Sequence, residues 1–310
     1  MNSHQINIIP SNQIDKQKWD KCIARSDNGT IYAQSFYLDT MSTNWNGLVL
    51  NDYEAIMPLC WKKKYGLSYL YQPAFMRHTA VIGNHVTDKI VNAFFCAIPK
   101  HFKYWDIDLK ENNINPQTIT AAHLSVNRRR NFFLPLNKEY EEINKDYKRL
   151  GQRMLKKGNE NKIVITRNCS PHEVIDFYKK HYSVLHKKIS ERDYKNLLSV
   201  ATIALKTGLA ATYLAKTFTG KIVGSYLILK DDKFIYSLIG GSDITGKETG
   251  AFYLLTDAAI KDHSNSERTF RFEGSDKKGI AFFNSQFNPV PMEYYNVKFN
   301  GLPWPLNLLK

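Results

Sequence analysis

The sequence of 310 residues holds only four cysteines, which are Cys22, Cys60, Cys96 and Cys169. They form no Cys-x-x-Cys pair and have no histidine at ligand spacing. This pattern argues against a disulfide framework and against the common zinc modules, so we expect reduced thiols in the core and no metal. No Ser-His-Asp or Cys-His arrangement stands out either, which leaves no sign of a hydrolase triad.

Long hydrophobic runs are also missing. No stretch approaches the run of about 18 apolar residues that a membrane-spanning helix needs. The opening residues MNSHQINIIPSNQID lack both the basic start and the apolar stretch of a signal peptide. We therefore expect a cytoplasmic protein without an integral membrane segment, and association with a membrane surface stays open.

Acidic residues are few relative to basic ones. The 43 Lys and Arg against 29 Asp and Glu give a formal net charge of +14, which favours anionic partners such as nucleic acid, a nucleotide or an acidic membrane surface. The excess is spread along the chain, so general solubility explains it as well as nucleic-acid binding does. Arg149, Arg153, Lys156 and Lys157 recur at helical spacing, which suits either tRNA phosphates or a solvated helix face.

Aromatic residues are abundant, with 18 Tyr and 17 Phe, and they argue for packed cores rather than disorder. The length allows one large domain or two of about 150 residues. Residues 138–158 (KEYEEINKDYKRLGQRMLKKG) begin acidic and end basic, an order that suits the dipole of a helix. We predict an N-terminal domain over 1–137, a connecting helix over 138–162 and a C-terminal domain over 163–310.

The second half reads as a regular alternation of strands and helices. Strands are predicted at IVITRN, AATYLAKTF, KIVGSYLILK, KFIYSLIGGS, TFRFEGS and MEYYNVKFN. Helices between them give the order β-α-α-β-β-β-α-β-α-β. The first half reads as a strand, two helices, three strands, a helix and two strands, so the two halves share a plan.

This plan resembles the GNAT superfamily of acyltransferases, with the first half as a degenerate copy. Two such units in tandem are similar to the Fem-like aminoacyltransferases of peptidoglycan synthesis and to related bacterial families. The segments that carry the resemblance are GTIYAQSFYL near Trp19, NFFLPLNKEYEEINKDYKRLGQRMLKKG and FRFEGSDKKGIAFFNSQFN. It implies an α/β fold with a mixed (α+β) sheet, built as two tandem GNAT-like domains.

The same resemblance implies an N-acyltransferase. An acyl or aminoacyl group would pass from acyl-CoA or aminoacyl-tRNA, bound as a co-substrate rather than as a permanent cofactor, to an amine acceptor. The acceptor would be a small molecule or a peptidoglycan precursor, and tRNA is a possible partner. The alternative is a non-catalytic GNAT-fold protein that binds coenzyme A or RNA.

The segment TGKETGA joins a predicted strand to a predicted helix, where a GNAT domain holds the pyrophosphate of coenzyme A. Unpaired N–H groups at a helix N-terminus and nearby glycines make an anion seat. The predicted cofactor-binding residues are Gly246, Lys247, Thr249, Gly250 and Ala251. The segment lacks the Arg or Gln that opens the GNAT pattern, and Glu248 adds a negative charge, so a plain turn is the alternative. Gly240 and Gly241 suit a bulge where two strands part.

Acyl transfer to an amine requires a base, and Glu273 is the candidate because it follows a predicted buried strand beside Gly274. An exposed carboxylate or a salt bridge to Arg271 is the alternative. Ser275 would share hydrogen bonds in the site or cap the next helix. Tyr295 is the candidate general acid, although core packing is the commoner role of strand tyrosines.

Tyr236, Arg271 and Lys277 are the predicted substrate-binding residues. The Fem-like pattern places a Lys implicated in catalysis after a Phe in the segment that follows the FEGS-like strand. This sequence has Phe283 and Asn284 there. The departure weighs against aminoacyl-tRNA chemistry, although Lys277 and Lys278 lie near in the sequence and could replace the charge.

Overall fold

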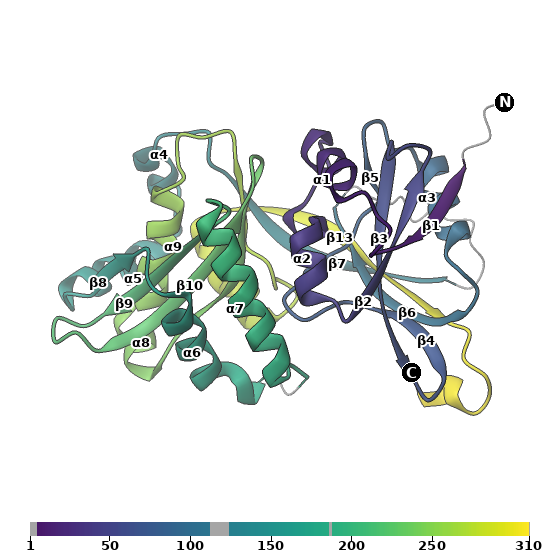
Figure 1. Cartoon of the computed structure of the whole chain (residues 1–310). Helices are drawn as coiled ribbons and strands as arrows, with labels where there is room; N and C mark the ends of the chain where they lie inside the picture. The colour runs from purple at the N-terminus through teal and green to yellow at the C-terminus, as the bar shows by residue number, and fades with distance from the viewer. Residues whose placement is uncertain (1–4, 112–123, 186–187, 310) are drawn as a thin grey trace. The chain divides into compact units, whose positions relative to one another are not determined.

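The computed structural model describes residues 5–111, 124–185 and 188–309. The chain divides into two compact units (Figure 1), of which unit 1 comprises Met1–Arg129 with Glu293–Lys310 and unit 2 comprises Arg130–Met292. Both units are mixed α/β, as predicted. In the three described ranges no helix combines the length and the apolar character that crossing a membrane requires.

Unit 1 is a mixed sheet with helices on it. Its strands follow the order β1-β2-β3-β4-β6-β13, with β5 paired to β3. Their bounds are β1 Ile6–Pro10, β2 Asn44–Leu50, β3 Ala55–Lys64, β4 Leu67–Tyr71, β5 Ile82–Gly83, β6 Phe102–Leu109 and β13 Val290–Asn300. The helices are α1 Lys16–Arg25, α2 Ser35–Met41 and α3 Asp88–Ala97, and the short 3-10 turns are η1 Ile31–Ala33 and η4 Leu306–Leu309.

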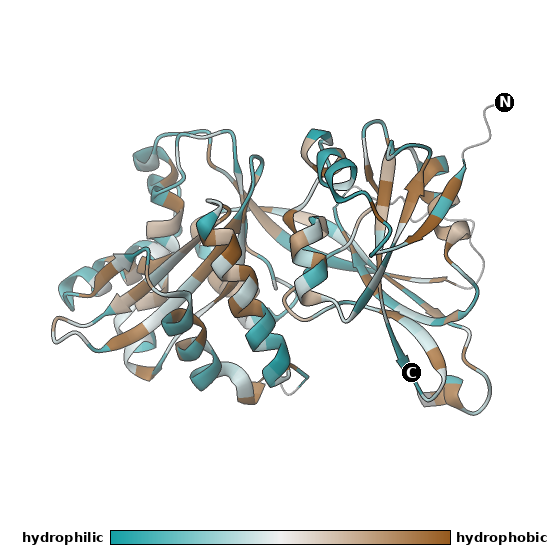
Figure 2. Ribbon diagram, in the orientation of Figure 1, coloured by the Kyte–Doolittle hydropathy of each residue, from teal (hydrophilic) through white to brown (hydrophobic). Residues whose placement is uncertain are grey.

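The strands of unit 2 follow the order β7-β12-β11-β10-β9-β8. The strands are β7 Leu124–Pro135, β8 Val164–Arg167, β9 Ala210–Lys216, β10 Ile222–Lys230, β11 Phe234–Ser242 and β12 Thr269–Arg271. The helices are α4 Tyr140–Lys145, α5 Arg149–Glu160, α6 Pro171–Tyr182, α7 Glu191–Lys206, α8 Ile244–Thr249, α9 Ala251–Lys261 and α10 Lys278–Asn284, and the 3-10 turns are η2 Ser183–Leu185 and η3 Ser285–Phe287. β10 is buried along almost its whole length, and it is largely hydrophobic in Figure 2.

Helices in unit 2 cover both faces of this sheet. A Cβ at Gly240 would meet Phe252 of α9, whereas a Cβ at the next residue, Gly241, would meet Tyr182 of α6. Successive residues of a strand point to opposite faces, so α6 and α9 lie on opposite faces of β11. Side chains from β9, β10, β12 and α9 form the core on one of these faces.

Local sequence signals explain where several helices begin. Ser190 caps α7 in a reciprocal capping box with Asp193, as its place before an apolar-periodic segment suggests. Asp15 caps α1 by accepting a hydrogen bond from the Lys18 N–H. Residues 138–162, predicted as one connecting helix, instead form the two helices α4 and α5, because the chain is extended at Lys148, where the Lys148 N–H donates to the Gln286 carbonyl.

The division of the chain into units also differs from the predicted domain boundaries. The change from unit 1 to unit 2 falls inside β7, between Arg129 and Arg130, and both α4 and α5 lie within unit 2. Residues 293–310, expected in the C-terminal domain, belong to unit 1. The reason is strand pairing, because β13 pairs antiparallel with β6 from Tyr295↔Leu109 to Asn300↔Tyr104.

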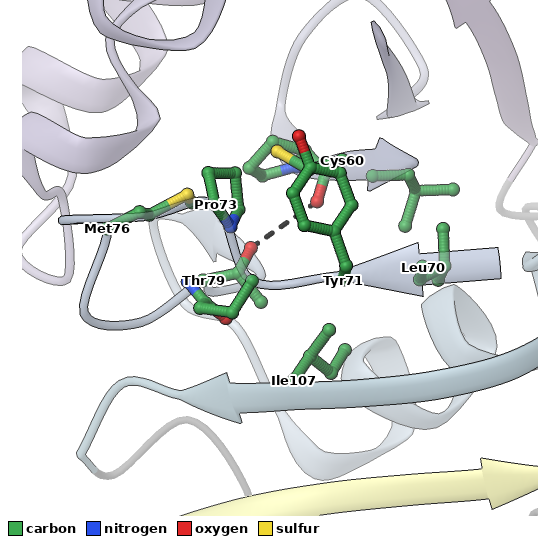
Figure 3. Close-up of a pocket in the computed structure, with 10 residues that line it drawn as sticks. Cys60, Leu70, Tyr71, Pro73, Met76, Thr79 and Ile107 are labelled. Carbon is green, nitrogen blue, oxygen red and sulfur yellow. Dashed lines mark hydrogen bonds between the residues drawn. The ribbon is translucent and has the colours of Figure 1, made fainter. Parts of the chain in front are cut away.

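The parallel strands β4 and β6 of unit 1 pair from Ser68↔Phe102 to Tyr71↔Asp106 and then part. The chain itself fills the space beyond, because the Thr79 N–H donates to the Asp108 carbonyl and the Lys110 N–H donates to the Thr79 carbonyl. Figure 3 shows Tyr71, Pro73 and Thr79 around what remains, a cavity of about 10 Å³. That is room for one water at most.

Candidate active site

The sheet of unit 2 opens between its two parallel strands. β11 and β12 pair at only three positions, from Phe234↔Thr269 to Tyr236↔Arg271, although β11 continues to Ser242. A bulge in β11 shifts its register against β10 between Leu227 and Ile228. Leu238 is the extra residue of this bulge, two residues before the glycine pair at which we expected it.

Glu273 lies just past this opening and is buried. Its Oε1 accepts a hydrogen bond from Arg271 Nε at 3.1 Å, and its Oε2 accepts one from Asn131 Nδ2 at 3.1 Å. The salt bridge that we considered as the alternative role of Glu273 is therefore present. Asn131 comes from β7, so two strands of unit 2 position the carboxylate.

Arg271 is enclosed by aromatic rings. Its guanidinium carbon lies 4.7 Å from the ring centre of Phe133, 5.2 Å from that of Phe234 and 5.5 Å from that of Tyr236. Only 1% of Arg271, a predicted substrate-binding residue, is exposed, and its Nε is paired with Glu273. Tyr236 is also buried, and its hydroxyl donates to Asp231 Oδ2 at 2.6 Å.

The turn after β12 is held from α10. Asn284 Nδ2 donates to Ser275 Oγ at 3.0 Å and to the Phe272 carbonyl at 3.3 Å. Ser275 is buried and its Oγ lies 3.5 Å from Oδ1 of Asn131, the residue that also bonds to Glu273. Lys277 stands at the N-cap position of α10, where its side chain makes no capping hydrogen bond, and it is exposed.

The predicted phosphate loop is not a loop. Residues 244–249 form α8, whose N-terminus is capped by Asp243: the Gly246 N–H donates to Asp243 Oδ1 at 2.7 Å and the Lys247 N–H to the Asp243 carbonyl at 2.9 Å. The anion at this helix N-terminus is thus a carboxylate of the chain itself. The Thr249 hydroxyl donates to the Thr245 carbonyl at 2.9 Å.

The start of α9 is closely packed against α5. Gly250 has φ +78°, and a Cβ there would lie 2.5 Å from the Met154 carbonyl oxygen of α5. A Cβ on Gly158 of α5 would meet Leu254 of α9 at 2.4 Å, and Ala251 is fully buried. The glycines therefore permit close packing of α5 against α8 and α9.

Tyr182 at the end of α6 occupies the open edge of β11. The Asp243 N–H donates to the Val223 carbonyl of β10, so the N–H and carbonyl of the preceding residue, Ser242, face the other edge. The Tyr182 hydroxyl accepts from the Ser242 N–H at 2.9 Å and donates to the Ser242 carbonyl at 2.9 Å. Burial raises the pKa of this hydroxyl, so it stays protonated.

Tyr295 lies in unit 1, where it is partly buried against the core and paired with Leu109. It is thus a core residue of the other unit, the alternative role considered for strand tyrosines. Arg149, Arg153, Lys156 and Lys157 are exposed on α5. Among the described residues no group of His, Cys, Asp and Glu could hold a metal ion.

Solved structures share this architecture along the whole chain. FemX is 12% identical, with 98% of this chain and 99% of FemX covered and a TM-score of 0.68. The chain has a Fem-like tandem GNAT fold. The tandem GNAT protein from the clavulanic acid biosynthesis pathway is 13% identical over 96% of this chain and 99% of its own, at a TM-score of 0.52. L-PGS from Bacillus licheniformis is 11% identical over 95% of both chains, also at 0.52.

No protein-family model matches the sequence, and the search of curated proteins finds no match. Within the Fem-like fold, three site residues escaped the sequence analysis: Asn131, Tyr182 and Asn284 in its structural role. Asn131 directly follows three arginines, and nothing in that charged run signals a buried amide. Tyr182 ends a helix far from β11 in the sequence, and nothing in the sequence signals that contact.

Proposed function

We propose that this protein is an N-acyltransferase that moves an aminoacyl group from aminoacyl-tRNA to an amine. The observation that carries this proposal is the opening between β11 and β12, with the buried carboxylate of Glu273 at the point where the strands part. Two parallel strands that part beside a fixed carboxylate suit a donor that must lie extended while an amine attacks its carbonyl carbon.

In the proposed reaction, the amine nitrogen forms a bond to the carbonyl carbon of the aminoacyl ester, and the bond from that carbon to the ribose oxygen breaks. Glu273 accepts the proton that the amine loses, and this proton finally reaches the departing oxygen. Arg271 and Asn131 hold the two carboxylate oxygens in place. Lys277 and Lys278 supply positive charge at the exposed start of α10.

Aminoacyl-tRNA is favoured over acyl-CoA by the state of the α8 region. A coenzyme A pyrophosphate needs free N–H groups at a helix N-terminus. Here the Asp243 carboxylate accepts the Gly246 N–H and brings a negative charge to the start of α8, and α5 packs against the start of α9. Asn284 stands where the Fem-like pattern has a lysine, which weakens the case for tRNA. That change removes only one positive charge, whereas the arrangement around α8 disfavours the predicted pyrophosphate site as a whole.

The experiment is a comparison of donors with the purified protein. Thermal melting is followed with acetyl-CoA, with a long-chain acyl-CoA and with charged and uncharged tRNA, because a ligand that binds only the native state raises the melting temperature. We expect a shift with charged tRNA and none with either thioester. A shift with the thioesters alone would overturn the choice of donor.

A second candidate is a protein that binds such donors without turnover. The direct salt bridge of Glu273 to Arg271 favours it, since a carboxylate bound in this way has a structural role already. Donor binding with no transfer of a labelled aminoacyl group to a panel of amines would support this candidate.

A further inference from the structure

Unit 1 has a cavity of about 260 Å³ where the β3–β4 hairpin meets the segment after β13. The two segments lie side by side in Figure 1. The residues that line the cavity are Lys64, Tyr65, Leu67, Tyr69, Tyr104, Leu302 and Leu306. The lining is thus apolar and aromatic, with one lysine at its margin.

Large apolar side chains around this cavity are unusually exposed. The exposed fraction is 87% for Tyr65, 79% for Trp304 and 74% for Leu308. Isolated exposed hydrophobic residues need no explanation, but a group of them beside an apolar cavity marks an interaction site. A tryptophan and a tyrosine among aliphatic side chains are the composition found where proteins meet the membrane–water interface.

The segment that carries Trp304 has a defined conformation. Asn300 Nδ2 donates to the Asn307 carbonyl at 2.9 Å, and Asn300 Oδ1 accepts from the Leu302 N–H at 3.3 Å. The Gly301 N–H donates to the Lys103 carbonyl at 2.8 Å, which ties the segment to β6. The apolar side chains therefore lie on a turn whose backbone is fixed by hydrogen bonds.

The β3–β4 hairpin carries lysines and no acidic residue, and Asp106, whose Oδ2 lies 3.4 Å from the Tyr104 hydroxyl, is paired with Lys298 at 3.4 Å. Residues 61–72 contain Lys62, Lys63 and Lys64 and no Asp or Glu, and residues 294–309 contain no Asp or Glu either. Lys63, Lys64 and Lys103 are exposed. Basic residues beside exposed aromatic and aliphatic ones complement an anionic lipid surface, since polybasic segments are attracted to such membranes.

We propose that this end of unit 1 is a docking surface for an anionic phospholipid bilayer. Tyr65, Trp304 and Leu308 enter the interfacial layer, the cavity accepts part of a lipid chain, and the lysines contact the headgroups. The proposal is independent of the transfer reaction, and it would bring the protein to acceptors that lie on a membrane.

The test uses the whole protein with vesicles of phosphatidylcholine alone and of phosphatidylcholine with phosphatidylglycerol. Trp19, Trp45 and Trp105 are buried and Trp61 is partly buried, so a blue shift of tryptophan emission on binding reports mainly on Trp304. We expect sedimentation and a blue shift with the anionic vesicles only. The Trp304→Phe variant should still sediment but lose the shift.

Charge is tested with a matched pair of double variants. Lys63→Gln with Lys64→Gln should weaken binding about 25-fold, about fivefold for each lysine. Lys195→Gln with Lys206→Gln removes the same charge from exposed positions on α7 and should change binding less than about twofold. All four side chains are exposed, and melting curves verify folding.

Three outcomes would overturn the proposal. One is no sedimentation with anionic vesicles at low salt. Another is an equal loss in both double variants, which would mean that net charge alone drives binding. The third is a blue shift that persists in Trp304→Phe.

Discussion

Glu273 combines burial with an unusual backbone conformation. Its φ is +37°, and that of the following Gly274 is +71°. A residue with a side chain in this region costs of order 1–3 kcal/mol, and such residues cluster where function requires them. The pair turns the chain sharply after β12 and leaves the carboxylate between Arg271 and Asn131.

If Glu273 is the base, Glu273→Gln should lower the rate of transfer per bound donor by about 10²- to 10⁴-fold while donor affinity stays unchanged. The measurement is single-turnover transfer from a saturating donor, together with donor affinity. Glu267→Gln is the matched control, because Glu267 is exposed in the segment just before β12 and loses the same charge.

Breaking a buried ion pair also destabilises a fold, by about 3–5 kcal/mol, so activity alone would mislead. A purely structural Glu273 would show as a lower melting temperature with an unchanged rate per bound donor. That result would remove its assignment as the base.

Gly250 offers a second test at the level of one residue. Gly250→Ala should cost more stability than Gly208→Ala, although both glycines have a similar positive φ, +78° and +75°. A Cβ at Gly208 meets nothing within 4 Å, whereas at Gly250 it would press on the Met154 carbonyl. We expect about 1–2 kcal/mol for Gly208→Ala and at least about 1 kcal/mol more for Gly250→Ala, measured by urea unfolding. Equal costs would mean that α5 is not packed against the start of α9.

Helices α4 and α9 meet through a partly buried carboxylate. The Tyr140 hydroxyl lies 3.0 and 2.9 Å from the two oxygens of Asp257, and Asn144 Nδ2 lies 3.5 Å from Oδ1. Lys261 Nζ stands 4.6 Å from the ring centre of Tyr140. Burial raises the pKa of Asp257 above its ordinary 3.8, although the hydrogen bonds from Tyr140, Tyr147 and Asn144 oppose the shift.

Because this pKa is raised in the folded state, the stability that Asp257 contributes is full below pH 3.8 and is lost as the pH rises through the folded pKa. Asp257→Asn removes this dependence. The stability of the natural protein relative to the variant should therefore fall between pH 4 and pH 7, as measured by urea midpoints at both values. A relative stability that rises with pH would instead mean that the tyrosine hydrogen bonds outweigh desolvation.

On the scale of the whole molecule, the final strand, β13, determines which residues make up each unit. β13 follows unit 2 in the sequence, yet from Glu293 onward it belongs to unit 1. Removal of residues 293–310 should therefore disrupt unit 1 and leave unit 2 folded, because β6 loses its partner from Tyr104 to Leu109.

Hydrogen exchange measures this directly. Amides of β6 should lose protection in the truncated protein, whereas those of β10 in unit 2 should keep it. Truncation after Gly301 spares β13 and is the control. Protection of β6 that survives the longer truncation would contradict the assignment of β13 to unit 1.

The sequence by itself determined most of the local structure. The alternation of apolar and polar runs predicted the order of strands and helices in the second half apart from α8, and Ser190 caps α7 just before an apolar-periodic segment. It also placed Glu273 and Ser275 after a buried strand, where the structure has them. These features depend on neighbours in the chain, so the local pattern carries them.

Only the tertiary structure decided which strands pair and which side chains from distant parts of the sequence meet. In the sequence, Asp243 is only a polar residue just before the predicted phosphate loop. The fold shows that its carboxylate caps α8. Tyr182 reaches the open edge of β11 across 60 residues, and Asn131 reaches Glu273 across 142. β13 likewise pairs with a strand of the other half. Which strands pair and which side chains are buried together depends on the free energy of the whole fold. A local sequence pattern predicts a strand but does not identify its partner.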